Sequence, residues 1–242
     1  MPLTRQDYEE RQRELTGLYR ELWPELSVEL AKLGPNRNIS KPFLIDLTAH
    51  KYAEAQTKLV IVGQQTNGWH TEVTIKGDPI DYSLGAYKDF QLGTEYFRSP
   101  FWRASHELYR SLNPNGPENG FIWTNLLKVD EKMGRPKPDV ANILHRYFNL
   151  LPKEIELAAP DVVVFFTGPN YDDMLKLTFP GITKNEIPDV RERAMTRLEC
   201  DRGALPQRTY RLYHPKYLNI SRQWDLIERI QDLAKANSAQ PI

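Results

Sequence analysis

Three polar clusters in the sequence carry side chains that can bind a small ligand and help it react. The first is the run Gly-Gln-Gln-Thr-Asn-Gly from Gly63 to Gly68, the second is Asn125, and the third is the pair His214-Pro215. An amide offers a donor and an acceptor on one side chain, and an imidazole can donate or accept a proton near neutral pH. Each feature alone is common as plain structure, so their arrangement decides whether they form a site.

Each cluster stands at the end of a predicted strand. Short apolar runs predict strands over Lys58–Gly63, Gly120–Leu127, Asp161–Phe166 and Thr209–Tyr213. In an open parallel sheet, ligands bind at the carboxyl ends of the strands. The three clusters therefore occupy the positions where such folds place their sites.

Helical periodicity separates the predicted strands and also precedes them. Leucines recur at steps of three or four from Thr4 to Leu33, where Pro24 predicts a kink or a break. Ser99-Pro100 opens a further helix, and an amphipathic helix from Ile220 to Ala234 closes the chain. The alternation predicts a three-layer α/β/α fold with a central, mainly parallel four-stranded sheet. We expect one domain over residues 1–242, with an N-terminal helical extension over about residues 1–40.

The composition limits the function further. The 242 residues include 32 basic and 32 acidic side chains, which excludes a uniformly basic nucleic-acid coat. The single cysteine, Cys200, excludes an internal disulfide, and the five histidines lack metal-ligand spacing. The common phosphate-loop, dinucleotide, nucleophile-elbow and zinc-protease motifs do not occur in the sequence. We expect a cytoplasmic monomer that needs no metal or organic cofactor. We expect no membrane partner, because no apolar run approaches the roughly 20 residues that span a bilayer.

Taken in order, the clusters resemble the motifs of the uracil-DNA glycosylase superfamily. In that family, a strand is followed by Gly-Gln-Asp-Pro-Tyr or Gly-Met-Asn-Pro-Gly, a second strand ends in Asn, a third ends in an apolar-Gly turn, and the last motif is His-Pro-Ser-Pro-Leu. The matching segments here are Leu59–Asn67, Gly120–Asn125, Val162–Phe166 with Gly168, and His214–Leu218. The resemblance covers about Lys58 to the C-terminus and leaves the N-terminal helix outside.

The resemblance implies a hydrolase, a monofunctional DNA N-glycosylase that cleaves the bond between the sugar and a base flipped out of DNA. Asn125 would bind the base, and His214 would stabilise charge on the leaving base. Gly63 would allow close approach of the backbone, and Gln64 and Gly68 would complete the substrate site. The candidate stacking platform is Tyr96 or Phe97, just before the Ser99-Pro100 helix start.

DNA is the partner that the resemblance implies. Leu218 aligns with the family's wedge leucine, which fills the gap left in the duplex, and its neighbour Tyr217 is the alternative. From Arg191 to Arg222 there are eight basic residues against three acidic ones, whereas Glu154 to Val190 has two against seven. Arg191, Arg193 and Lys216 are therefore expected to contact phosphates, and further basic residues, Lys128 among them, follow the Asn125 strand.

Two departures from the family pattern bear on the chemistry. The strongest enzymes of the family have Asp where this chain has Gln65, so the water would be placed by Gln65 or Asn67. Asp130 is a possible substitute carboxylate, although a solvated loop acid is the simpler interpretation. The most uracil-selective members have a tyrosine where this chain has Asn67-Gly68, which leaves space beside carbon 5 of the base.

This space predicts a base that is either uracil or a 5-modified pyrimidine, such as a hypermodified base of phage DNA, with a role in repair or antiviral defence. Trp69 would stack on a sugar substituent or pack in the core. The alternatives are a non-catalytic relative that binds DNA or a nucleotide, and a hydrolase of small nucleosides.

Overall fold

A six-stranded sheet runs through the part of the chain that the computed structural model describes, residues 3–70, 77–201 and 203–236. Its order is β2-β1-β3-β6-β5-β4. The strands are β1 Leu59–Gly63, β2 Ile122–Asn125, β3 Val162–Phe165, β4 Ile182–Asn185, β5 Met195–Cys200 and β6 Arg208–Leu212. The four predicted strands are β1, β2, β3 and β6, and they pair in parallel.

The expected strand number of four is wrong, because β4 and β5 extend the sheet in antiparallel fashion beyond β6. β4 is only partly buried along its length, and its sequence Ile-Thr-Lys-Asn carries little apolar signal. Antiparallel strands with one solvated face lack the continuous apolar run that marks buried parallel strands. The mixed α/β class was predicted correctly.

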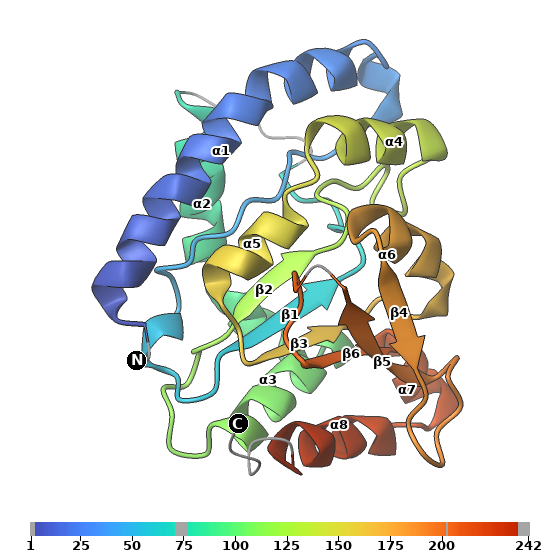
Figure 1. The fold of residues 1–242 in the computed structure, drawn as a ribbon. Coiled ribbons are helices and arrows are strands. Elements are labelled where there is room, and N and C mark those ends of the chain that lie inside the picture. The colour runs from blue at the N-terminus through green and yellow to red at the C-terminus, as the bar shows by residue number, and fades with distance from the viewer. Residues whose placement is uncertain (1–2, 71–76, 202, 237–242) are drawn as a thin grey trace.

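Helices cover both faces of the sheet. Figure 1 shows α1, α4 and α5 on one side and α3 and α8 on the other. The helices are α1 Arg5–Ala31, α2 Pro79–Asp89, α3 Pro100–Leu112, α4 Pro138–Tyr147, α5 Leu151–Ala158, α6 Asp172–Thr178, α7 Pro215–Ser221 and α8 Asp225–Ala236. The helix predicted from Ile220 is thus two helices, separated around Arg222, which has a left-handed φ of 56°.

The N-terminal helix belongs to the core. α1 continues through Pro24 without a break, and it buries Tyr8, Leu15 and Tyr19. The Tyr19 hydroxyl donates to Oε1 of the buried Glu154 in α5 at 2.8 Å. Of the kink or break predicted at Pro24, the break does not occur.

The sheet topology brings five loops to one edge. Because β1, β2, β3 and β6 are parallel, the loops after them leave from the same side. β5 is antiparallel to β6, with Met195 opposite Leu212, so the loop that precedes β5 reaches this side as well. We call this side the strand-end edge. No helix in the described ranges is long and apolar enough to cross a membrane.

Candidate functional site

Gly63 and Asn125 lie side by side at the strand-end edge, in register on β1 and β2. A Cβ on residue 63 would overlap Oδ1 of Asn125, so the glycine makes room for that side chain. Asn125 is 1% exposed, and its Nδ2 has no hydrogen-bond partner among the described residues. Buried polar groups are nearly always satisfied, so an unpaired amide at a strand end suits a ligand acceptor.

His214 follows β6 and caps α7, with its Nδ1 accepting from the Lys216 backbone N–H at 3.2 Å. Burial lowers the pKa of the imidazole to about 4, and the charge of Lys216 adds to the effect. The ring is therefore neutral at physiological pH. Since Nδ1 is the acceptor, the proton sits on Nε2, which becomes a hydrogen-bond donor.

The aromatic ring of Phe101 lies between His214 and Gly63. The sequence did not identify Phe101 as a site residue. Its ring stacks on His214 with centroids 5.8 Å apart and planes at 23°. Its Cε2 lies 3.5 Å from the position of a Cβ on Gly63. Phe101 stands in the first turn of α3, where a helical side chain leans toward the N-terminus, and this direction was the available signal.

Tyr96 and Phe97, the predicted stacking candidates, are 55% and 64% exposed. The Tyr96 ring stacks on Phe90, and the Arg98 guanidinium lies over the Phe97 ring at 5.6 Å. The ring of Phe101, in contrast, stacks on His214 and lies next to Gly63. A stacking role for Tyr96 or Phe97 stays a prediction.

The loop after β1 is fixed by the loop after β3. Gln64 Nε2 donates to the Thr167 carbonyl at 2.8 Å. The Tyr171 hydroxyl donates to Gln65 Oε1, and the Arg135 guanidinium lies over the Tyr171 ring at 4.3 Å. With its Oε1 engaged, Gln65 offers N–H donors to a ligand, whereas the exposed Asn67 presents its amide to solvent.

Asp130 is buried, with 0% exposure, so the solvated loop acid of the sequence interpretation is wrong. Its Oδ2 accepts from the Thr66 hydroxyl at 2.7 Å and from the Gly68 N–H at 2.8 Å. Its Oδ1 accepts from the Met133 N–H at 2.9 Å. The carboxylate thus clamps the β1 loop to the β2 loop and is engaged through both oxygens.

Trp69 packs in an aromatic cluster next to this clamp. Its ring meets Phe43, Phe90 and Trp123 edge to face, with centroids 5.0 to 5.9 Å apart. Of the two predicted alternatives for Trp69, the structure shows packing against the core.

Leu218 is 0% exposed and belongs to the hydrophobic core, so the predicted wedge role for this side chain is wrong. Residue 218, which matches the wedge position of the family motif, lies within α7. Its side chain is on the face of the helix that packs against the core. Tyr217, the alternative, is 50% exposed and packs its ring against Tyr213 at 4.7 Å.

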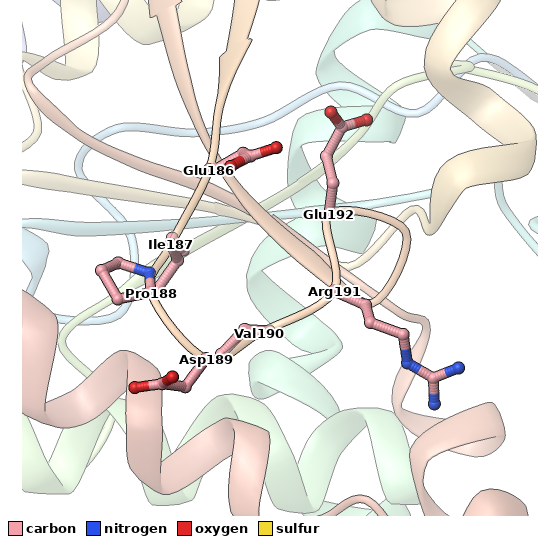
Figure 2. Close-up of a pocket in the computed structure, with 7 residues that line it drawn as sticks. All are labelled: Glu186, Ile187, Pro188, Asp189, Val190, Arg191 and Glu192. Carbon is pink, nitrogen blue, oxygen red and sulfur yellow. The ribbon is translucent and has the colours of Figure 1, made fainter.

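The predicted phosphate contacts Arg191, Arg193 and Lys216 are all exposed near the His214 loop. The Tyr213 N–H donates to the Ala194 carbonyl at 3.0 Å, which joins the loop before β5 to this loop. Residues Glu186–Glu192 line a hollow of about 440 Å³ in the same loop. Figure 2 shows the Arg191 guanidinium pointing away from the acidic side chains around that hollow.

Two other basic residues are structural: Arg211, within the counted segment, and Lys128, after the Asn125 strand. Arg211 is 0% exposed and pairs with Asp172 at 3.2 Å. Lys128 is buried against Glu154 and donates to Thr124 Oγ1 at 2.6 Å. Neither can reach a phosphate, and Arg202 lies outside the described residues. The positive surface at the strand-end edge is therefore smaller than the sequence count implied.

In the described ranges, no three His, Cys, Asp or Glu side chains gather as for a metal ion.

Comparison with known proteins identifies the family of the chain. No curated protein matches it. The family model of the Uracil DNA glycosylase superfamily matches residues 50–234, which include all the strands and the site described above. The chain belongs to the uracil DNA glycosylase superfamily.

Proposed function

We propose that the protein is a monofunctional DNA glycosylase that hydrolyses the N-glycosidic bond of a flipped-out uracil or 5-modified pyrimidine. The observation that carries this proposal is the buried, unpaired amide of Asn125, which lies against Gly63 and near the ring pair of Phe101 and His214. Family membership supports the glycosylase class.

Base recognition follows from the chemistry of the Asn125 amide. Its Oδ1 can accept from a pyrimidine ring N–H while Nδ2 donates to the neighbouring carbonyl. Since Nδ2 is buried without a partner, a base that lacks the carbonyl would leave this donor unpaired at a cost of about 1–3 kcal/mol. The half-buried ring of Phe101 supplies a stacking surface for the base.

Cleavage moves the electron pair of the bond between C1′ and the ring nitrogen onto the base, so negative charge develops on its carbonyl oxygen. Neutral His214 donates from Nε2 to that oxygen, and no proton leaves the imidazole. Water then bonds to C1′, and its proton goes to the departing base. The N–H donors of Gln65 and the exposed amide of Asn67 place the water.

A direct test uses duplexes that contain uracil or 5-hydroxymethyluracil, together with hypermodified phage DNA, each treated with alkali to reveal abasic sites. We expect base release, and Asn125→Ala and His214→Ala should each lower its rate by about 100-fold or more. The exposed Asn142 and His145 of α4 give matched control variants, Asn142→Ala and His145→Ala. Normal rates in both site variants end the assignment. Release from uracil alone removes the modified bases from the proposal.

DNA would bind along the exposed Arg191, Arg193 and Lys216. Each phosphate contact that is removed should lower the slope of log affinity against log salt by about 1. The exposed Arg110 at the end of α3 is the matched control, because α3 begins at the strand-end edge and ends away from it. If substitution of Arg191, Arg193 and Lys216 leaves the salt slope of the affinity unchanged, these residues do not contact phosphates.

A second candidate, a relative that binds flipped nucleotides without cleaving them, is favoured by one observation. Gln65 replaces the family's carboxylate, and Asp130 is engaged through both oxygens by the loop clamp. This candidate predicts tight binding to the same duplexes with no alkali-labile sites.

A further inference from the structure

The side chain of Met133 covers Gly68. The sequence predicted free space beside carbon 5 of the base at this position. The Met133 Cγ, Cε and Sδ atoms lie 3.4, 3.5 and 3.9 Å from the position that a Cβ on residue 68 would take. Gly68 has a φ of 76°, in the left-handed region, and no side chain of its own. The room predicted from Asn67-Gly68 is therefore partly filled from another loop.

The backbone around Met133 is held in an unfavourable conformation. Lys132 and Met133 have φ values of 54° and 61°, in the left-handed region that non-glycine residues rarely adopt. The Met133 N–H donates to Asp130 Oδ1, and Glu131 and Gly134 exchange backbone hydrogen bonds of 3.2 and 3.1 Å. The same carboxylate holds Gly68, so the two loops keep a fixed relation.

The side chain on this fixed backbone is 61% exposed. A large apolar side chain held in solvent on a strained turn has no role in the core of this fold. Methionine is unbranched and adapts its shape to its neighbours. An exposed methionine over a glycine can therefore close a small site or swing aside for a larger ligand.

We propose that Met133 is the adjustable wall of the base site on the carbon 5 side, and that it determines which substituents the site admits. This inference rests on the proposed function and deepens it. With uracil, the thioether lies over Gly68 and contacts the base edge. With a substituent on carbon 5, the side chain moves into solvent while Asp130 keeps the backbone in place.

The test compares kcat/KM for uracil and 5-hydroxymethyluracil in otherwise identical duplexes. Met133→Ala should lower the value for uracil by about tenfold, mainly through KM, and leave the value for 5-hydroxymethyluracil within about twofold. Met133→Leu retains apolar volume and should keep most of the wild-type ratio. Val28→Ala, at a side chain 56% exposed on α1, controls for the loss of an exposed apolar group.

A second measurement detects the position of the Met133 side chain without turnover. With ¹³C-methyl methionine, the Met133 methyl signal, assigned with Met133→Leu, should differ between complexes with non-hydrolysable 2′-fluoro analogues of the two nucleotides. The buried Met195 methyl should not differ. Identical Met133 signals in the two complexes, or an equal effect of Met133→Ala on both substrates, overturn the inference and leave the proposed function standing. Failure of the wild-type protein to bind either duplex overturns both.

Discussion

The ring of Phe101 stacks on the imidazole of His214, with centroids 5.8 Å apart and planes at 23°. One residue opens α3 and the other caps α7, so two helix N-termini contribute side chains to one point of the strand-end edge. Phe101 also contacts Phe166 edge to face at 5.9 Å, which holds its ring in place.

Phe101 is expected to be the main stacking surface for the base. Stacking of a base on an aromatic ring contributes about 1–3 kcal/mol, so Phe101→Ala should weaken duplex binding and base release by about 10- to 100-fold. Phe101→Leu retains apolar packing against Phe166 and serves as the control for folding. A larger loss with Tyr96→Ala or Phe97→Ala would restore the assignment made from the sequence.

The pH dependence should reflect a neutral His214. Its pKa of about 4 lies below the ordinary 6.5, because burial disfavours the imidazolium. The rate of base release should show no inflection near pH 6.5, and a rate measured from pH 4 to pH 8 checks this. An inflection near 6.5 that disappears in His214→Gln would contradict the buried, neutral ring.

The same group affects stability in a defined direction. Between pH 6.5 and about 4 the unfolded chain binds a proton at residue 214 and the folded chain does not. The free energy of unfolding should therefore fall as the pH drops through this window, and His214 should contribute no further loss below it. Denaturant unfolding of wild type and His214→Gln at several pH values separates this contribution from those of other histidines.

Tyr171 is expected to act as a positioning residue for Gln65. The Tyr171 hydroxyl donates a hydrogen bond to Gln65 Oε1, and the Arg135 guanidinium covers the Tyr171 ring. Tyr171→Phe retains the ring and frees the amide to rotate, so kcat should fall by about tenfold with little change in KM or in thermal stability. Gln65→Ala should add little to this loss in the double variant. Additive losses would show that the two side chains act separately.

Asp130→Asn tests the loop clamp. The amide replaces one acceptor oxygen with a donor that faces the Gly68 or Met133 N–H group, so a buried donor loses its partner. The free energy of unfolding should fall by about 1–3 kcal/mol in urea titration. The exposed Asp232 of α8 gives the control variant Asp232→Asn. An unchanged stability with a complete loss of base release would instead identify Asp130 as a catalytic carboxylate.

The sequence alone determined the parallel part of the sheet and the strand ends that carry Gly63, Asn125 and His214. Buried parallel strands need continuous apolar runs, and a glycine or an amide that interrupts such a run is visible without a structure. The antiparallel strands β4 and β5 were missed because a strand with one solvated face needs no such run.

Only the tertiary structure decided which side chains surround the site. The sequence does not give the direction of a side chain. From the sequence, Phe101 is one residue of a helix face, Leu218 is a leucine of the family motif, and Lys128 is one of several basic residues. Packing turned Phe101 toward His214 and buried Leu218 in the core. The approach of Met133 to Gly68 joins two loops 65 positions apart, and it depends on a buried carboxylate, Asp130, whose hydrogen bonds no local pattern reveals.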